Sequence, residues 1–266
     1  MHTVNREQFG SILRGLGISH GDSLLVHSAL QFLGQPEGGI GMYCDALCEE
    51  SGNAKGTIAV PTFNFAFARG KPFDPQNTSS NGVGVFSEFV RLLPGALRTT
   101  HPMHSLAVIG FYAPELAGCD TPSAFDPGSA FEKMLDLDFK LLLLGADIQS
   151  VSMVHYCEQR AQVPYRYWKQ FTGLVRIYPP GGESEGEWWT TRTYRMFVRD
   201  LDIDPQLNLS PVQNLLEARG QWASQPLNYG RVSTCRLVDF VKATDELLGA
   251  DPWALVENRP NGIRDA

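Results

Sequence analysis

The chain has 266 residues, 43% of them hydrophobic and 19% charged, a balance typical of a folded globular protein that argues against wholesale disorder. Its net charge of −7 repels phosphate backbones, so we expect no nucleic-acid partner. The most apolar run, Leu141 to Gly145, is too short to cross a bilayer and no apolar leader is evident, so we expect a cytoplasmic protein without a membrane partner.

Four short apolar runs, each bounded by glycine or turn residues, predict strands. In chain order they span residues 23–27, 57–61, 106–110 and 139–144, and residues 190–198 alternate in polarity as a further strand would. Periodic apolar residues predict helices over 6–16, 41–51, 85–93, 153–162 and 237–248. Strands that alternate with helices predict an α/β fold, in which ligands bind beyond the carboxyl ends of the strands.

The first predicted strand leads into His27-Ser28-Ala29-Leu30, and we expect a helix to follow. A small hydroxyl residue at such a turn presents backbone N–H groups and the positive end of the helix dipole to an anion. These four residues are therefore candidates to hold a phosphate group or a pantetheine chain. An ordinary serine helix cap is the alternative, and on local sequence alone it is the commoner arrangement.

Two histidines three residues apart, His101 and His104, precede the strand at 106–110. A metal site needs three or four ligands, and the neighbouring sequence offers no acidic residue or third histidine. We therefore expect a hydrogen-bonded loop and no metal here. A metal-dependent hydrolase that uses both histidines together with His155 and Glu158 is an open alternative.

The strongest group of candidate residues follows the strand at 139–144. His155 and Glu158 lie early in the helix predicted over 153–162, where residues three apart share a face. A carboxylate partner holds one tautomer of a histidine and stabilises the imidazolium that forms when the ring accepts a proton. This spacing predicts His155 as a general base with Glu158 as its partner, and a surface ion pair is the alternative.

In this order the motifs resemble those of the aminoglycoside N3-acetyltransferase family, also called the antibiotic N-acetyltransferase family. The matching segments are 21–30, 56–63, 84–91, 100–105, 142–145 with His155 and Glu158 beyond, and 163–166. We predict a single domain over residues 1–266, and the matching segments all lie in its first part, residues 1–172. Residues 173–250 are expected to complete that domain, and residues 251–266 to form a loosely held tail.

The resemblance implies an α/β fold with a central mixed sheet flanked by helices, distinct from the GNAT fold. It also implies an N-acetyltransferase that uses acetyl-CoA as donor. The acceptor amine would attack the thioester directly, with His155 taking its proton and Glu158 orienting the imidazole. The residues it places near coenzyme A are His27, Ser28, Ala29, Leu30, His101 and Ser105.

The loop before His155 departs from the pattern of the antibiotic-modifying members, where an acidic residue and an amide are typical at the positions of Gln149 and Val151. A polycationic acceptor needs carboxylates. Gln149 and Val151 remove groups that could hold such an acceptor. The expected small-molecule partner is therefore an amine of either an aminoglycoside or an amino-sugar-like compound. Acetylation of a nucleotide-linked amino sugar in glycan or natural-product biosynthesis, and a non-catalytic module that binds coenzyme A, are the alternatives. A homodimer is left open.

Overall fold

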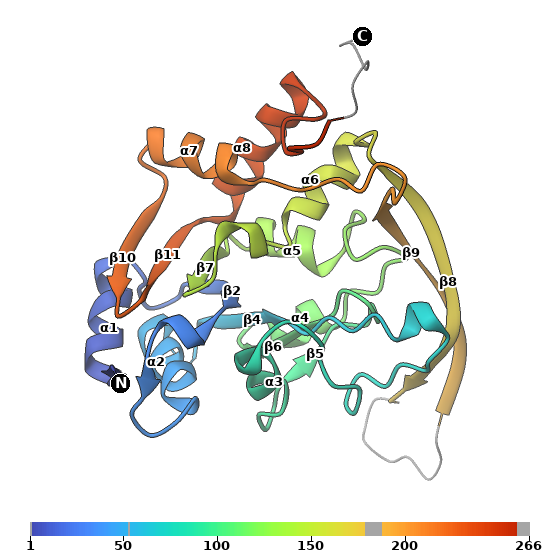
Figure 1. Cartoon of the computed structure of the whole chain (residues 1–266). Coiled ribbons are helices and arrows are strands. Elements are labelled where there is room, and N and C mark those ends of the chain that lie inside the picture. The colour runs from blue at the N-terminus through green and yellow to red at the C-terminus, as the bar shows by residue number, and fades with distance from the viewer. Residues whose placement is uncertain (1, 53, 179–187, 260–266) are drawn as a thin grey trace.

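A seven-stranded mixed sheet runs through the molecule in the order β10-β11-β7-β2-β4-β6-β5 (Figure 1). The computed structural model describes residues 2–52, 54–178 and 188–259. Strands β7, β2 and β4 are parallel and form the centre of the sheet, while the strands on either side are antiparallel. The bounds are β2 Ser23–Ser28, β4 Thr57–Pro61, β5 Leu97–Arg98, β6 Leu106–Gly110, β7 Lys140–Leu144, β10 Ala223–Leu227 and β11 Gly230–Arg236.

The central strands are apolar throughout because both faces of the sheet are covered. Leu25, Leu141 and Leu143 enter one hydrophobic core, whereas Leu24 and Leu142 enter the other. Three helices supply the second core: α1 Arg6–Gly15, α2 Gly41–Ser51 and α3 Val85–Arg91. Five supply the first: α4 Ala113–Ala117, α5 Ala130–Asp136, α6 Val154–Ala161, α7 Ser210–Ala218 and α8 Leu237–Ala250.

A long antiparallel hairpin of β8 (Arg166–Ile177) and β9 (Trp188–Arg199) stands beside the main sheet (Figure 1). It packs on a third, smaller core of five buried side chains: Phe67, Phe73, Met103, Val175 and Tyr194. Four residues separate the end of α6 from the start of β8. Because this connection is short, the first residue of β8 lies against α6. A short pair, β1 (Thr3–Val4) with β3 (Gln35–Pro36), completes the strands of the described residues.

The predicted α/β fold with a central mixed sheet is confirmed, and the strands at 23–27, 57–61, 106–110 and 139–144 agree with the structure to within a residue at each end. The helix expected after Leu30 is wrong, since only a single 3₁₀ turn, Leu30–Phe32, follows β2. Its three side chains include no fully buried residue, so no apolar face anchors a longer helix there.

The expectation of a loosely held tail is wrong for residues 251–259. Trp253 and Leu255 are buried, and Val256 forms a bridge to Leu207. The rest of that tail, residues 260–266, lies outside the described residues. Across the described ranges, no helix combines the length and the apolarity that a membrane span requires.

Gly145 ends β7 with φ +68°, a left-handed conformation that side chains disfavour. A Cβ there would lie 2.6 Å from the carbonyl oxygen of Ala29 and 3.0 Å from Leu33. We expect Gly145→Ala to lower the free energy of unfolding by about 1–3 kcal/mol, measured by urea denaturation. Gly249→Ala in α8, where a Cβ meets nothing within 4 Å, is the control and is expected to be neutral or slightly stabilising. Equal effects of the two changes would contradict the close approach.

Candidate active site

A cavity of about 370 Å³ lies between α6 and the β8–β9 hairpin. It lies beyond the carboxyl ends of the central parallel strands, where ligands of α/β proteins bind. We call it the His155 cavity. It is lined by Phe65, Ala68, His104, Ser123, Phe125, His155, Arg166, Phe171, Met196, Phe197, Val198 and Arg199.

His155 stands in the first turn of α6, with its Nδ1 atom 2.7 Å from Oε2 of Glu158. The histidine is partly exposed to the cavity, whereas Glu158 is fully buried. A carboxylate can only accept from Nδ1, so the proton belongs on that nitrogen and the lone pair on Nε2. The predicted pairing of His155 with Glu158 is thus present in the geometry that a general base requires.

Arg166, the first residue of β8, places its Nε atom 2.9 Å from the same Oε2 of Glu158 and is only 10% exposed. Burial alone raises the pKa of Glu158, but the hydrogen bond and charge of His155 and the charge of Arg166 outweigh it, so that pKa lies below its ordinary value. Glu158 therefore stays ionised at neutral pH.

The guanidinium of Arg166 also approaches His155, with Nη2 3.2 Å from Nδ1. Nδ1 cannot both accept from Arg166 and donate to Glu158. The contact with the carboxylate is the shorter of the two, and an ionised acceptor makes the stronger bond. We therefore assign the Nδ1 proton to the bond with Glu158.

A polar network holds α6 one turn after His155, through Gln159. Gln159 accepts from Ser123 Oγ at 2.7 Å and donates from Nε2 to Asp126 at 3.0 Å. Asp126 in turn accepts from Arg195 of β9 at 2.9 Å. The network ties α6, the loop before α5 and the hairpin together, so the wall of the His155 cavity is held from three directions.

His27 and the three residues after it occupy the end of β2. Burial lowers the pKa of His27 to about 3, and its Nε2 lies 3.4 Å from Ser152 Oγ. The backbone N–H of Ala29 donates to Leu144, so it is not available to an anion. The predicted anion site at residues 27–30 relied on the dipole of a following helix. Only a 3₁₀ turn follows β2, so that dipole is missing. Ser28, Ala29 and Leu30 remain half-buried at this edge.

Ser105, which the resemblance places near coenzyme A, is engaged within the protein. Ser105 is fully buried, donates to the Thr62 carbonyl and accepts from Nε of Arg98, each at 3.0 Å. His101 is also buried, and its Nδ1 accepts from the backbone N–H of His104 at 3.2 Å. Neither residue lines the His155 cavity. His101 positions His104 through the hydrogen bond to its backbone.

Sequence reasoning missed two functional neighbours of His155. The spacing of residues along the chain does not indicate that Arg166 is paired with Glu158 inside the protein. His104 was predicted to lie in a hydrogen-bonded loop without a catalytic role, although it lines the cavity beside His155. The signal for Arg166 was Pro164, which follows the end of α6 and cannot continue a helix.

Among the described residues, no group of three or more His, Cys, Asp or Glu side chains is placed to hold a metal ion.

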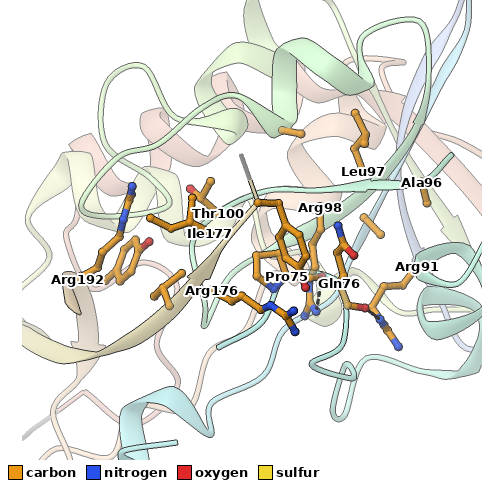
Figure 2. Close-up of a pocket in the computed structure, with 15 residues that line it drawn as sticks. Pro75, Gln76, Arg91, Ala96, Leu97, Arg98, Thr100, Arg176, Ile177 and Arg192 are labelled. Carbon is orange, nitrogen blue, oxygen red and sulfur yellow. Dashed lines mark hydrogen bonds between the residues drawn. The ribbon is translucent and has the colours of Figure 1, made fainter. Parts of the chain in front are cut away.

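A larger cavity of about 490 Å³ lies elsewhere, under the far end of the hairpin (Figure 2). Arg91 and Arg192 stand at its opposite ends, with Arg98 and Arg176 between them. Three of these arginines pair with carboxylates, and Arg98 is bound by backbone carbonyls and hydroxyls. No histidine is among the described residues that line this cavity, so the candidate acid–base pair is found in the smaller one.

A family model described as aminoglycoside 3-N-acetyltransferase matches residues 25–249 of the chain. The aminoglycoside N(3)-acetyltransferase III of Salmonella sp is 32% identical over 212 residues, which cover 73% of this chain and 72% of the relative. The crystal structure of aminoglycoside acetyltransferase AAC(3)-Xa superposes with a TM-score of 0.80 at 23% identity and covers 96% of this chain and 94% of its own. AAC-IIIb, solved as a binary complex with CoASH, has a TM-score of 0.78 at 22% identity and covers 97% and 100%.

Removing the shared carboxylate tests the buried pair. We expect Glu158→Gln to lower the free energy of unfolding by about 3–5 kcal/mol at neutral pH, because it leaves the buried Arg166 cation without its anion. Glu246→Gln is the control, because Glu246 is 56% exposed and pairs with Arg219 on the surface. There we expect about 0–1 kcal/mol. Urea denaturation measures both, and equal losses would contradict the buried pair.

The same variant gives a pH test. The pKa of Glu158 is lowered from 4.5 in the folded protein, so its contribution to stability is present above pH 4.5 and is lost as the pH falls through the lower folded value. We therefore expect the difference between wild type and Glu158→Gln to shrink as the pH falls below 4.5. A difference that stays constant between neutral and strongly acidic pH would show that Glu158 is not the ionised partner.

Proposed function

The chain belongs to the aminoglycoside 3-N-acetyltransferase family, and from that membership we propose that it transfers an acetyl group from acetyl-CoA to an amine of an aminoglycoside or amino-sugar-like acceptor. The observation that carries the proposal is the His155–Glu158 pair at the wall of a cavity large enough for a small molecule. It is the pairing that removal of a proton from an attacking amine requires.

Three residues, His155, Glu158 and Arg166, have separate roles in this reaction. Nε2 of His155 accepts the proton of the amine as its nitrogen bonds to the acyl carbon, and Glu158 stabilises the resulting imidazolium. Arg166 holds the carboxylate in place from the opposite side. When the carbon–sulfur bond breaks, the imidazolium returns that proton to the departing thiolate, so the pair is restored for the next turnover.

Acetyl-CoA supplies the activated acyl group, and we place its narrow pantetheine chain along the edge where Ser28 and Gly84 approach each other. Gly84 has φ +87°, and a Cβ on it would lie 3.2 Å from the carbonyl oxygen of Ser28. A side chain would therefore fill the space between the two segments. The relative solved with CoASH supports the same co-substrate for this chain.

The acceptor side of the cavity supports a second candidate substrate. None of the described residues that line it is a carboxylate, whereas Arg166 and Arg199 are cationic. Aromatic rings such as Phe65 and Phe125 suit the apolar face of a sugar, and an arginine suits a phosphate. This composition favours an acceptor with few ammonium groups, so a nucleotide-linked amino sugar is the runner-up to an aminoglycoside.

We expect His155→Ala to lower kcat by about 10²–10⁴-fold, because it removes the general base. Release of free thiol from acetyl-CoA measures the rate against a panel of aminoglycosides, simple amino sugars and nucleotide-linked amino sugars. His20→Ala, a change at an exposed histidine, is the control and is expected to keep full activity.

The panel separates the outcomes. Turnover with any member that depends on His155 supports the proposal, and the preferred member names the acceptor. Full activity of His155→Ala would contradict the assigned base. Binding of acetyl-CoA without turnover of any amine would favour the non-catalytic module instead.

A further inference from the structure

We propose that His104 is a second catalytic residue, whose neutral imidazole donates a hydrogen bond to the thioester carbonyl oxygen as negative charge develops there. The inference rests on the proposed function, because it assigns a role within acetyl transfer. It gives the reaction two histidines with different tasks, a base for the amine and a donor for the oxyanion.

The position of His104 places it on the same cavity as the base. It lies two residues before β6, is 9% exposed and lines the His155 cavity. The centroids of the His104 and His155 rings are 6.1 Å apart. Both side chains line the same cavity, so one bound acyl group can be reached by the two rings from that cavity.

Aromatic rings hold His104 in one orientation. Phe63 and Phe65 meet it edge to face, with centroid distances of 4.9 and 5.6 Å, and Phe125 packs against it at 5.2 Å. Its backbone N–H donates to His101, which fixes the main chain as well. A donor that is already oriented costs no reorganisation when charge develops, which is the requirement for stabilising an oxyanion.

Among the described residues no hydrogen bond is made by a ring nitrogen of His104, and the side chain lines the His155 cavity. The other polar groups on the cavity are engaged: Ser123 donates to Gln159, and Arg166 pairs with Glu158. Arg199 at the rim pairs with Asp204. The N–H of His104 is therefore the polar group on this wall that is left free to bind a ligand oxygen in the cavity.

The electrostatic surroundings keep His104 neutral. Burial, followed by the charges of His101, His155 and Arg166, lowers the pKa of His104 well below its ordinary value. A neutral imidazole carries one N–H donor and does not compete with His155 for the proton of the amine. Neutral histidine is known to serve as such an electrophile at other carbonyl groups.

The step balances in atoms and charge. The amine nitrogen bonds to the acyl carbon, the carbonyl electron pair moves to oxygen, and His104 N–H binds that oxygen while His155 takes the amine proton. When the carbonyl re-forms, the carbon–sulfur bond breaks and the thiolate leaves with the electron pair, then receives the proton from His155. His104 is unchanged throughout.

The test compares His104→Leu, which removes the donor, with His104→Gln, which keeps a neutral N–H. We expect His104→Leu to lose about 10²–10³-fold in kcat, as loss of an oxyanion donor does elsewhere. KM for acetyl-CoA should change little, and His104→Gln should recover part of the loss. Met103→Leu, a volume-conserving change at the buried neighbour, controls for packing and is expected to keep wild-type kcat.

Infrared spectroscopy of bound acetyl-CoA labelled with carbon-13 at the carbonyl gives a direct readout. We expect the C=O stretch at a lower frequency on the wild type than on His104→Leu. Wild-type kcat in His104→Leu, a loss confined to KM, or an equal C=O frequency on both proteins would overturn the inference while His155-dependent turnover leaves the proposed function standing. Absence of wild-type turnover on every amine would instead count against the proposed function, and the C=O frequencies would still decide the role of His104.

Discussion

The site depends on one buried carboxylate. Glu158 is fully buried, and its Oε2 atom meets Nδ1 of His155 at 2.7 Å and Nε of Arg166 at 2.9 Å. A lone carboxylate at such a position would take up a proton, because desolvation penalises the charged form. The two nitrogen partners reverse that preference. They keep Glu158 ionised and thereby decide which nitrogen of His155 is free to act.

This contact forms because the fold brings α6 and β8 together. α6 follows the central strand β7 and supplies His155 and Glu158, while β8 returns over the helix with Arg166. The Ser123–Gln159–Asp126–Arg195 network holds α6 against the loop before α5 and against β9. The same hairpin lines the His155 cavity, so the element that completes the ion pair also forms a wall of the cavity.

Much of the fold was predictable from the sequence because the central strands are short apolar runs bounded by glycine or turn residues. The pairing of His155 with Glu158 was predictable as well, since residues three apart on a helix share a face. Arg166 was not, because its partner lies on a different element and β8 reads as a mixed polar and aromatic segment. The burial of Ser105 was not either, since its partners Thr62 and Arg98 come from two other strands or their ends. The helix expected after Leu30 failed because no apolar face supports it.

The tautomer of His155 tests the central claim most directly. Nitrogen-15 NMR of histidine-labelled protein distinguishes a protonated ring nitrogen from an unprotonated one, and the His155→Ala spectrum identifies the signals that belong to this residue. In the neutral imidazole the structure requires the proton on Nδ1, bound to Glu158, with Nε2 unprotonated. A proton on Nε2, or an equal population of the two tautomers, would contradict the role assigned to Glu158 and with it the role of His155 as base.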